Sequence, residues 1–94
     1  MNNETRIKCM QNLLQEQLKT TYLNIIDDSH KHIGHVGAQT GAGHFTIEIS
    51  SPLFINQTRI ACHKMVYTAL QAMMPQDIHA LQIKTCNNHQ DENQ

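Results

Sequence analysis

The hydrophobic pattern begins with a helix-like repeat near the start of the chain. Apolar residues recur there at the spacing of one helix face: Ile7, Met10, Leu13, Leu14 and Leu18. Asn3 is a suitable N-cap, and the acidic Glu4 suits the first turn. The pattern therefore predicts a helix from about Glu4 to Lys19.

Three shorter segments have the composition or the alternation of β-strands. Residues 22–27 (YLNIID) form a short run that is rich in β-forming residues. In residues 45–50 (FTIEIS) and 81–84 (LQIK), apolar and polar residues alternate, which is typical of half-buried strands. Ser51-Pro52 closes the second strand, and Leu53-Phe54 begins a short irregular or single-turn element.

A second long helix is predicted between the second and third strands. Residues at helical spacing mark it: Ile60, His63, Val66, Tyr67, Leu70, Met73 and Met74. Asn56 or Thr58 is a suitable N-cap, and Pro75 is expected to end the helix. A single domain over residues 1–86 and a polar tail over residues 87–94 follow from this pattern.

This order of elements predicts an α+β domain with a three-stranded mixed sheet. A loop joins the first two strands, which favours an antiparallel pair, and a helix joins the second to the third, which favours a parallel crossover. Parallel strands begin at the same edge of a sheet, so His79 should lie close to His44 and to the loop before it. Simple alternation groups His79 with Leu81 and Ile83, at the mouth of the core face.

Composition and charge argue against a basic nucleic-acid-binding domain and against a disulfide-rich protein. The chain has 94 residues, seven basic and eight acidic side chains and a formal net charge of −1, unlike most nucleic-acid-binding domains. Its three cysteines, Cys9, Cys62 and Cys86, are far apart and odd in number, so a disulfide framework is not expected. With no signal-peptide pattern and no apolar run of the ~18–20 residues that span a membrane, a reducing, cytoplasmic location is expected.

The segment between the first two strands carries the most distinctive chemistry. Four of the seven histidines, His30, His32, His35 and His44, fall within residues 30–44, together with all four glycines. Imidazole is the commonest metal ligand and titrates near neutral pH. Exposed loops also tolerate histidine, so a merely polar loop is the competing interpretation. His44 is expected to be structural and to bond neighbouring backbone.

Five motifs in this order resemble the BolA family from about Ile7 to Ile83. They are Asp28-Ser29-His30-Lys31-His32, Gly43-His44-Phe45, Ser50-Ser51-Pro52-Leu53-Phe54, Cys62-His63-Lys64-Met65-Val66-Tyr67 and Ile78-His79-Ala80-Leu81. The resemblance implies an αββααβ domain similar to type II KH domains, with the helices packed on one face of the sheet. It also implies a non-enzymatic adaptor or regulator in iron–sulfur cluster handling.

The partner that the resemblance implies is a monothiol glutaredoxin, which shares a bridging 2Fe–2S cluster with the BolA-like protein. The glutaredoxin supplies its cysteine and a glutathione thiol. On this chain the family pattern implies His79 as one ligand and His32 as the second, with His35 and His30 as alternatives. Two imidazoles complete only half of a four-ligand set, so no cluster should be stably bound by the isolated chain.

Two further functions compete with this one, and a homodimer is left open. A KH-like fold suggests a nucleic-acid-binding transcriptional regulator, with Arg59 and Lys64 as the basic residues and weak, salt-sensitive DNA binding. Residues 34–37 (GHVG) match the GxxG of KH domains, but they lie between strands rather than between helices. Three loop imidazoles also suit a lone zinc or nickel ion.

Overall fold

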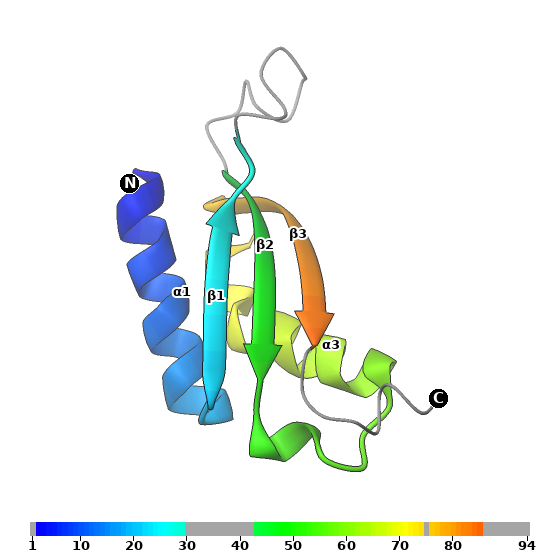
Figure 1. Ribbon diagram of the computed structural model, residues 1–94. Helices are drawn as coiled ribbons and strands as arrows, with labels where there is room; N and C mark the ends of the chain where they lie inside the picture. Colours follow the sequence, from blue (N-terminus) through cyan, green and yellow to red (C-terminus); the bar gives the residue numbers. More distant parts are fainter. Residues whose placement is uncertain (1, 30–42, 75, 86–94) are drawn as a thin grey trace.

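The structure is a computed structural model that describes residues 2–29, 43–74 and 76–85. Strands β1 (Tyr22–Asp27), β2 (Gly43–Ser50) and β3 (Ile78–Thr85) form one sheet in the order β1-β2-β3. The first pair is antiparallel and the second is parallel. Two helices cover one face of this sheet (Figure 1). The predicted α+β class and mixed sheet are therefore confirmed.

Helix α1 (Asn3–Leu18) has the predicted apolar face but a different cap. Met10, Leu14 and Leu18 are buried. The side chain of Asn2, not that of Asn3, accepts a hydrogen bond from the Thr5 amide at 2.8 Å. The prediction of Asn3 as the N-cap is wrong, because the helix begins one residue earlier. Asn3 lies within the first turn, where its side chain is available for contacts with the strands.

Helix α3 (Arg59–Ala69) ends earlier than its hydrophobic spacing predicts. Thr58 caps its start, with its hydroxyl accepting from the Ala61 amide at 3.0 Å. The Leu70 amide is shared between the carbonyls of Val66 and Tyr67, and the chain then tightens into the single turn η3 (Gln71–Met73). This tighter turn brings Met73 into the core, so the apolar spacing continues although the α-helix does not.

Two residues of the predicted apolar stripe in α3 face outward. Ile60 is 69% exposed and Tyr67 is 41% exposed. The Tyr67 hydroxyl donates to the Leu81 carbonyl at 3.3 Å, so this side chain joins α3 to the edge strand β3. Helical spacing identified the segment as a helix, but it overestimated the width of the buried face.

The core lies between the two helices and the covered face of the sheet. On β2 the predicted alternation holds for Phe45, Ile47 and Ile49, each of which is at most 2% exposed. The buried hydrophobic set is Met10, Leu14, Leu18, Phe45, Ile47, Ile49, Phe54, Cys62, Val66, Ala69, Leu70, Met73, Ile78 and Ile83. Cys62 is thus a core residue. Within the described residues, no helix is long and apolar enough to cross a membrane.

Candidate functional site

The parallel pairing of β2 with β3 brings two histidines from distant parts of the sequence together. His44 is the second residue of β2, and His79 is the second residue of β3. Their ring centroids are 5.1 Å apart, and the ring planes are inclined at 55°. Both strands begin at the edge where residues 30–42 join β1 to β2 (Figure 1).

A β-bulge sets the direction of the His79 side chain. Gly43 pairs with Ile78, whereas the next residue, His44, pairs with Ala80, so His79 is the extra residue of the bulge. Ile78 is fully buried, and His79 is exposed. Placing His79 on the core face with Leu81 and Ile83 is therefore wrong, because a bulge reverses the alternation beyond it. The imidazole of His79 is therefore exposed, although its backbone is part of strand β3.

The backbone of His44 forms hydrogen bonds with the two residues that follow β1. Its amide donates to the Ser29 hydroxyl at 3.2 Å, and its carbonyl accepts from the Asp28 amide at 2.8 Å. The side chain is only 5% exposed and lies against the ring of His79. The expected hydrogen bond from the His44 side chain to neighbouring backbone stays a prediction.

Asp28 is a buried acidic residue at the same edge. It is 9% exposed, and its carboxylate accepts a hydrogen bond from the buried hydroxyl of Thr46. A hollow of ≈ 220 Å³ lies beside this pair, lined by Asp28, His44, Phe45, Ala80, Leu81 and Gln82. It is smaller than the ~300–1,000 Å³ typical of small-molecule pockets, so the edge is better suited to a surface contact than to an enclosed ligand.

Gly43 starts β2 where its backbone lies against a core ring. A Cβ atom added there would lie 2.3 Å from Cε2 and 2.5 Å from Cζ of Phe45. The Phe45 ring is 2% exposed and cannot swing into solvent without leaving the core. The absence of a side chain at position 43 therefore allows the strand and the ring to pack together.

We expect Gly43→Ala to lower the free energy of unfolding by ~1–3 kcal/mol, the usual cost of overpacking. Urea denaturation followed by circular dichroism measures this. In a Phe45→Leu background the clashing ring atoms are absent, so the same substitution should cost less. An equal cost in both backgrounds would show that the Phe45 ring is not the cause.

The comparisons with known proteins agree on one family. The family model described as BolA-like protein matches residues 14–90. The chain belongs to the BolA-like family. It is 39% identical over 74 residues to the UV-induced protein uvi31 of Schizosaccharomyces pombe, covering 74% of this chain and 72% of that protein.

Two further comparisons involve a plant protein. This BolA-like chain is 31% identical over 75 residues to the SufE-like protein 1, chloroplastic/mitochondrial, of Arabidopsis thaliana, covering 74% of this chain but only 20% of that protein. The solved BolA domain of SufE1 from the same plant superposes with a TM-score of 0.75 at 25% identity, covering 90% of this chain and 94% of that one.

His30, His32 and His35 lie outside the described residues, as do residues 34–37 with their GxxG pattern. Within the described ranges, no three His, Cys, Asp or Glu side chains form a group that could hold a metal ion. The lone zinc or nickel site therefore stays a prediction.

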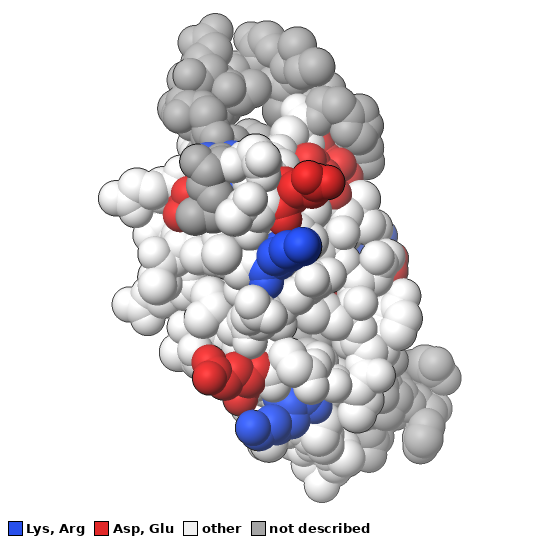
Figure 2. Space-filling view, turned by 90° about the vertical axis from the view of Figure 1, so that its left-hand side faces the viewer, with Lys and Arg blue, Asp and Glu red and all other residues white. Residues whose placement is uncertain are grey.

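The basic residues of the nucleic-acid alternative are exposed but do not share one face. Arg59 and Lys64 are five positions apart on α3, which corresponds to roughly 140° around the helix axis. On the side of the molecule drawn in Figure 2, the charged side chains of the described residues are few and of both signs, and they form no basic patch. Neither observation favours binding to a phosphate backbone.

Proposed function

We propose that this BolA-like chain is a non-enzymatic partner of a monothiol glutaredoxin and shares a bridging 2Fe–2S cluster with it. The observation that carries the proposal is the position of His79. Its imidazole is exposed on a bulge of a framework strand, at the edge where the histidine-rich segment leaves β1 and enters β2. A ligand in that position is accessible to a second protein.

The donor set of this edge suits an iron–sulfur cluster that is completed by a partner. Imidazole pairs replace thiolates on one iron in some 2Fe–2S centres. His79 would be one such ligand, and His32 is the proposed second ligand, with His30 and His35 as alternatives. The cysteines Cys9 and Cys62 belong to the helices, and Cys62 is buried. Cys86 lies outside the described residues. As the family resemblance implies, the remaining ligands would be thiolates from the glutaredoxin and its glutathione.

The chain's own residues would act by presenting the imidazole, not by catalysing a reaction. The contact between the rings of His44 and His79 limits how far the His79 ring can turn. A neutral imidazole adds no negative charge to a cluster, so exchanging thiolate for histidine raises its reduction potential. We therefore propose that the chain adjusts the stability or transfer of a cluster that the glutaredoxin carries.

Anaerobic mixing of the full chain with a monothiol glutaredoxin, glutathione, iron and sulfide tests this function. We expect a heterocomplex with two irons and two sulfides per pair and a visible spectrum that differs from that of the glutaredoxin alone. The chain alone should be colourless. A stoichiometric cluster on the isolated chain, or no heterocomplex at all, would contradict the proposal.

A further inference from the structure

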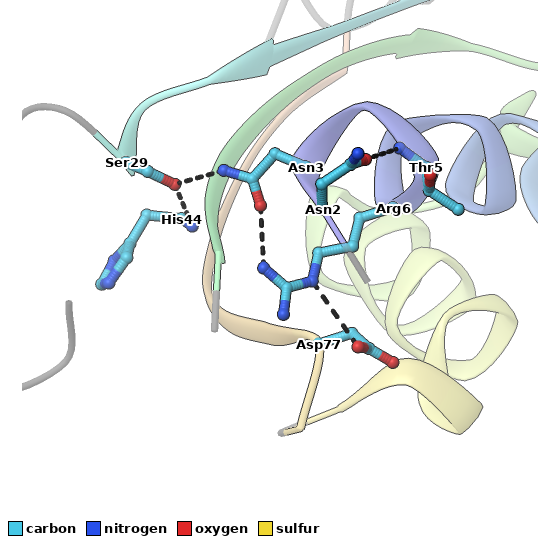
Figure 3. Close-up of polar contacts among 7 residues, drawn as sticks. All are labelled: Asn2, Asn3, Thr5, Arg6, Ser29, His44 and Asp77. Carbon is cyan, nitrogen blue, oxygen red and sulfur yellow. Dashed lines mark hydrogen bonds and ion pairs between the residues drawn. The ribbon is translucent and has the colours of Figure 1, made fainter. Parts of the chain in front are cut away.

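The first turn of α1 contacts the end of β1 close to the histidine edge. The Asn3 side-chain amide donates to the Asp27 carboxylate at 2.9 Å and to the Ser29 hydroxyl at 3.1 Å. The same hydroxyl accepts from the His44 amide, so one polar chain runs from Asn3 through Ser29 to His44 (Figure 3). Asn3 can make these contacts because Asn2 caps the helix.

Arg6, one turn further along α1, extends this chain of contacts to the start of β3. Its Nη1 donates to the Asn3 side-chain oxygen at 2.8 Å, and its Nε lies 3.5 Å from the Asp77 carboxylate (Figure 3). The Asp77 carbonyl accepts from the Gly43 amide at 3.0 Å. Asp77 lies two positions before His79 in the sequence. It therefore joins Arg6 to Gly43, the first residue of β2.

The ion pair of Arg6 and Asp77 is partly shielded from solvent. The Arg6 side chain is 11% exposed and that of Asp77 is 26% exposed, so water and salt screen the pair less than they would screen a surface pair. Asp77 directly precedes β3, close to the bulge where the register between β2 and β3 shifts. Side-chain contacts thus support the strand ends next to the shift in register.

We propose that Asn3 and Arg6 are positioning residues for His79. They hold the first residues of β2 and β3 in the register that places the His79 ring against His44. Both residues precede position 14, where the match to the family model begins, so the match does not account for them. The positioning is a property of the apo chain, and only its consequence for a cluster rests on the proposed function.

Hydrogen exchange and histidine NMR on Arg6→Gln test the positioning without a cluster. The Gly43 amide donates to the Asp77 carbonyl, and Asp77 loses its ion-pair partner in this variant. We therefore expect the Gly43 amide to exchange about tenfold faster and the His79 ring signals to move toward those of an unstructured histidine. Arg59→Gln is the matched control, because it makes the same change at an exposed position of α3. It should leave both signals unchanged.

A second control separates positioning from general loosening. Ser51→Ala removes the buried hydrogen bond from Ser51 to the Leu18 carbonyl, at the opposite end of α1. It should lower stability and leave the His79 ring signals in place. Equal effects of Arg6→Gln and Ser51→Ala on those signals, or no effect of Arg6→Gln, would overturn the proposal. If Arg6→Gln does not fold, Asn3→Ala is measured in the same way and decides the question.

The cluster complex then provides the second readout. Arg6→Gln should shorten the lifetime of the cluster shared with the glutaredoxin, whereas Arg59→Gln should not. If the wild-type chain forms no such cluster, the proposed function fails, and the Gly43 exchange rate and His79 signals still decide whether Arg6 positions His79.

Discussion

His79→Ala is expected to shorten the lifetime of the cluster in the glutaredoxin complex by about 100-fold or more. Loss of a residue that only supports a metal ligand typically costs 10–100-fold, so loss of a ligand itself should cost at least as much. The side chain is exposed, so the free energy of unfolding should change by no more than about 0.5 kcal/mol. Visible circular dichroism of the complex and urea denaturation of the chain measure the two effects.

Substitutions at other histidines provide the controls. His32→Ala should have a smaller effect than His79→Ala, because His30 and His35 are near enough in sequence to substitute for it. The triple alanine variant of His30, His32 and His35 should match the His79→Ala defect. His63→Ala, on α3, should leave the cluster unchanged. An unaltered spectrum and lifetime in His79→Ala would show that family membership describes the fold here and not a cluster ligand.

The parts of the fold that local pattern controls could be predicted from the sequence. Residues 22–27 were expected as a strand and form β1, and the buried face of α1 follows the 3.6-residue spacing. The errors lie at the ends of elements. Both Asn2 and Asn3 can cap a helix. After α3 ends at Ala69, a tighter turn follows in which Met73 is buried. Such choices depend on tertiary packing, which spacing alone does not contain.

The candidate site was predictable only in outline. The order of elements indicates that His44 and His79 start neighbouring parallel strands, and this follows from topology alone. The sequence does not indicate the bulge. His79, Leu81 and Ile83 occupy every second position, as residues on one face of a regular strand would. Contacts between residues 24 or more positions apart, such as Asn3 with Asp27, are also absent from any local pattern. The signal available in the sequence for Asp28 is a pair of adjacent aspartates at the end of an apolar strand.

Phe45→Ala is expected to be among the most damaging core substitutions, at ~3–5 kcal/mol of unfolding free energy. Phe45 lies in the central strand, pairs with Asp27 on one side and Leu81 on the other, and is 2% exposed. Folding free energies of small domains are about 5–15 kcal/mol, so much of the stability would be lost. Urea denaturation of the apo chain measures the change.

Measuring stability and cluster binding in several variants distinguishes a loss of folding stability from the loss of a cluster ligand. Phe45→Leu keeps most of the volume and should cost less than Phe45→Ala, and it should still support a cluster. Phe45→Ala should lose cluster and fold together. Lowering the temperature toward about 10–20 °C, where folding stability is usually greatest, or adding a stabilising osmolyte should restore both. His79→Ala should lose the cluster with the fold intact, and neither treatment should restore it. A Phe45→Ala chain as stable as wild type would show that the ring does not organise the core beneath the histidine edge.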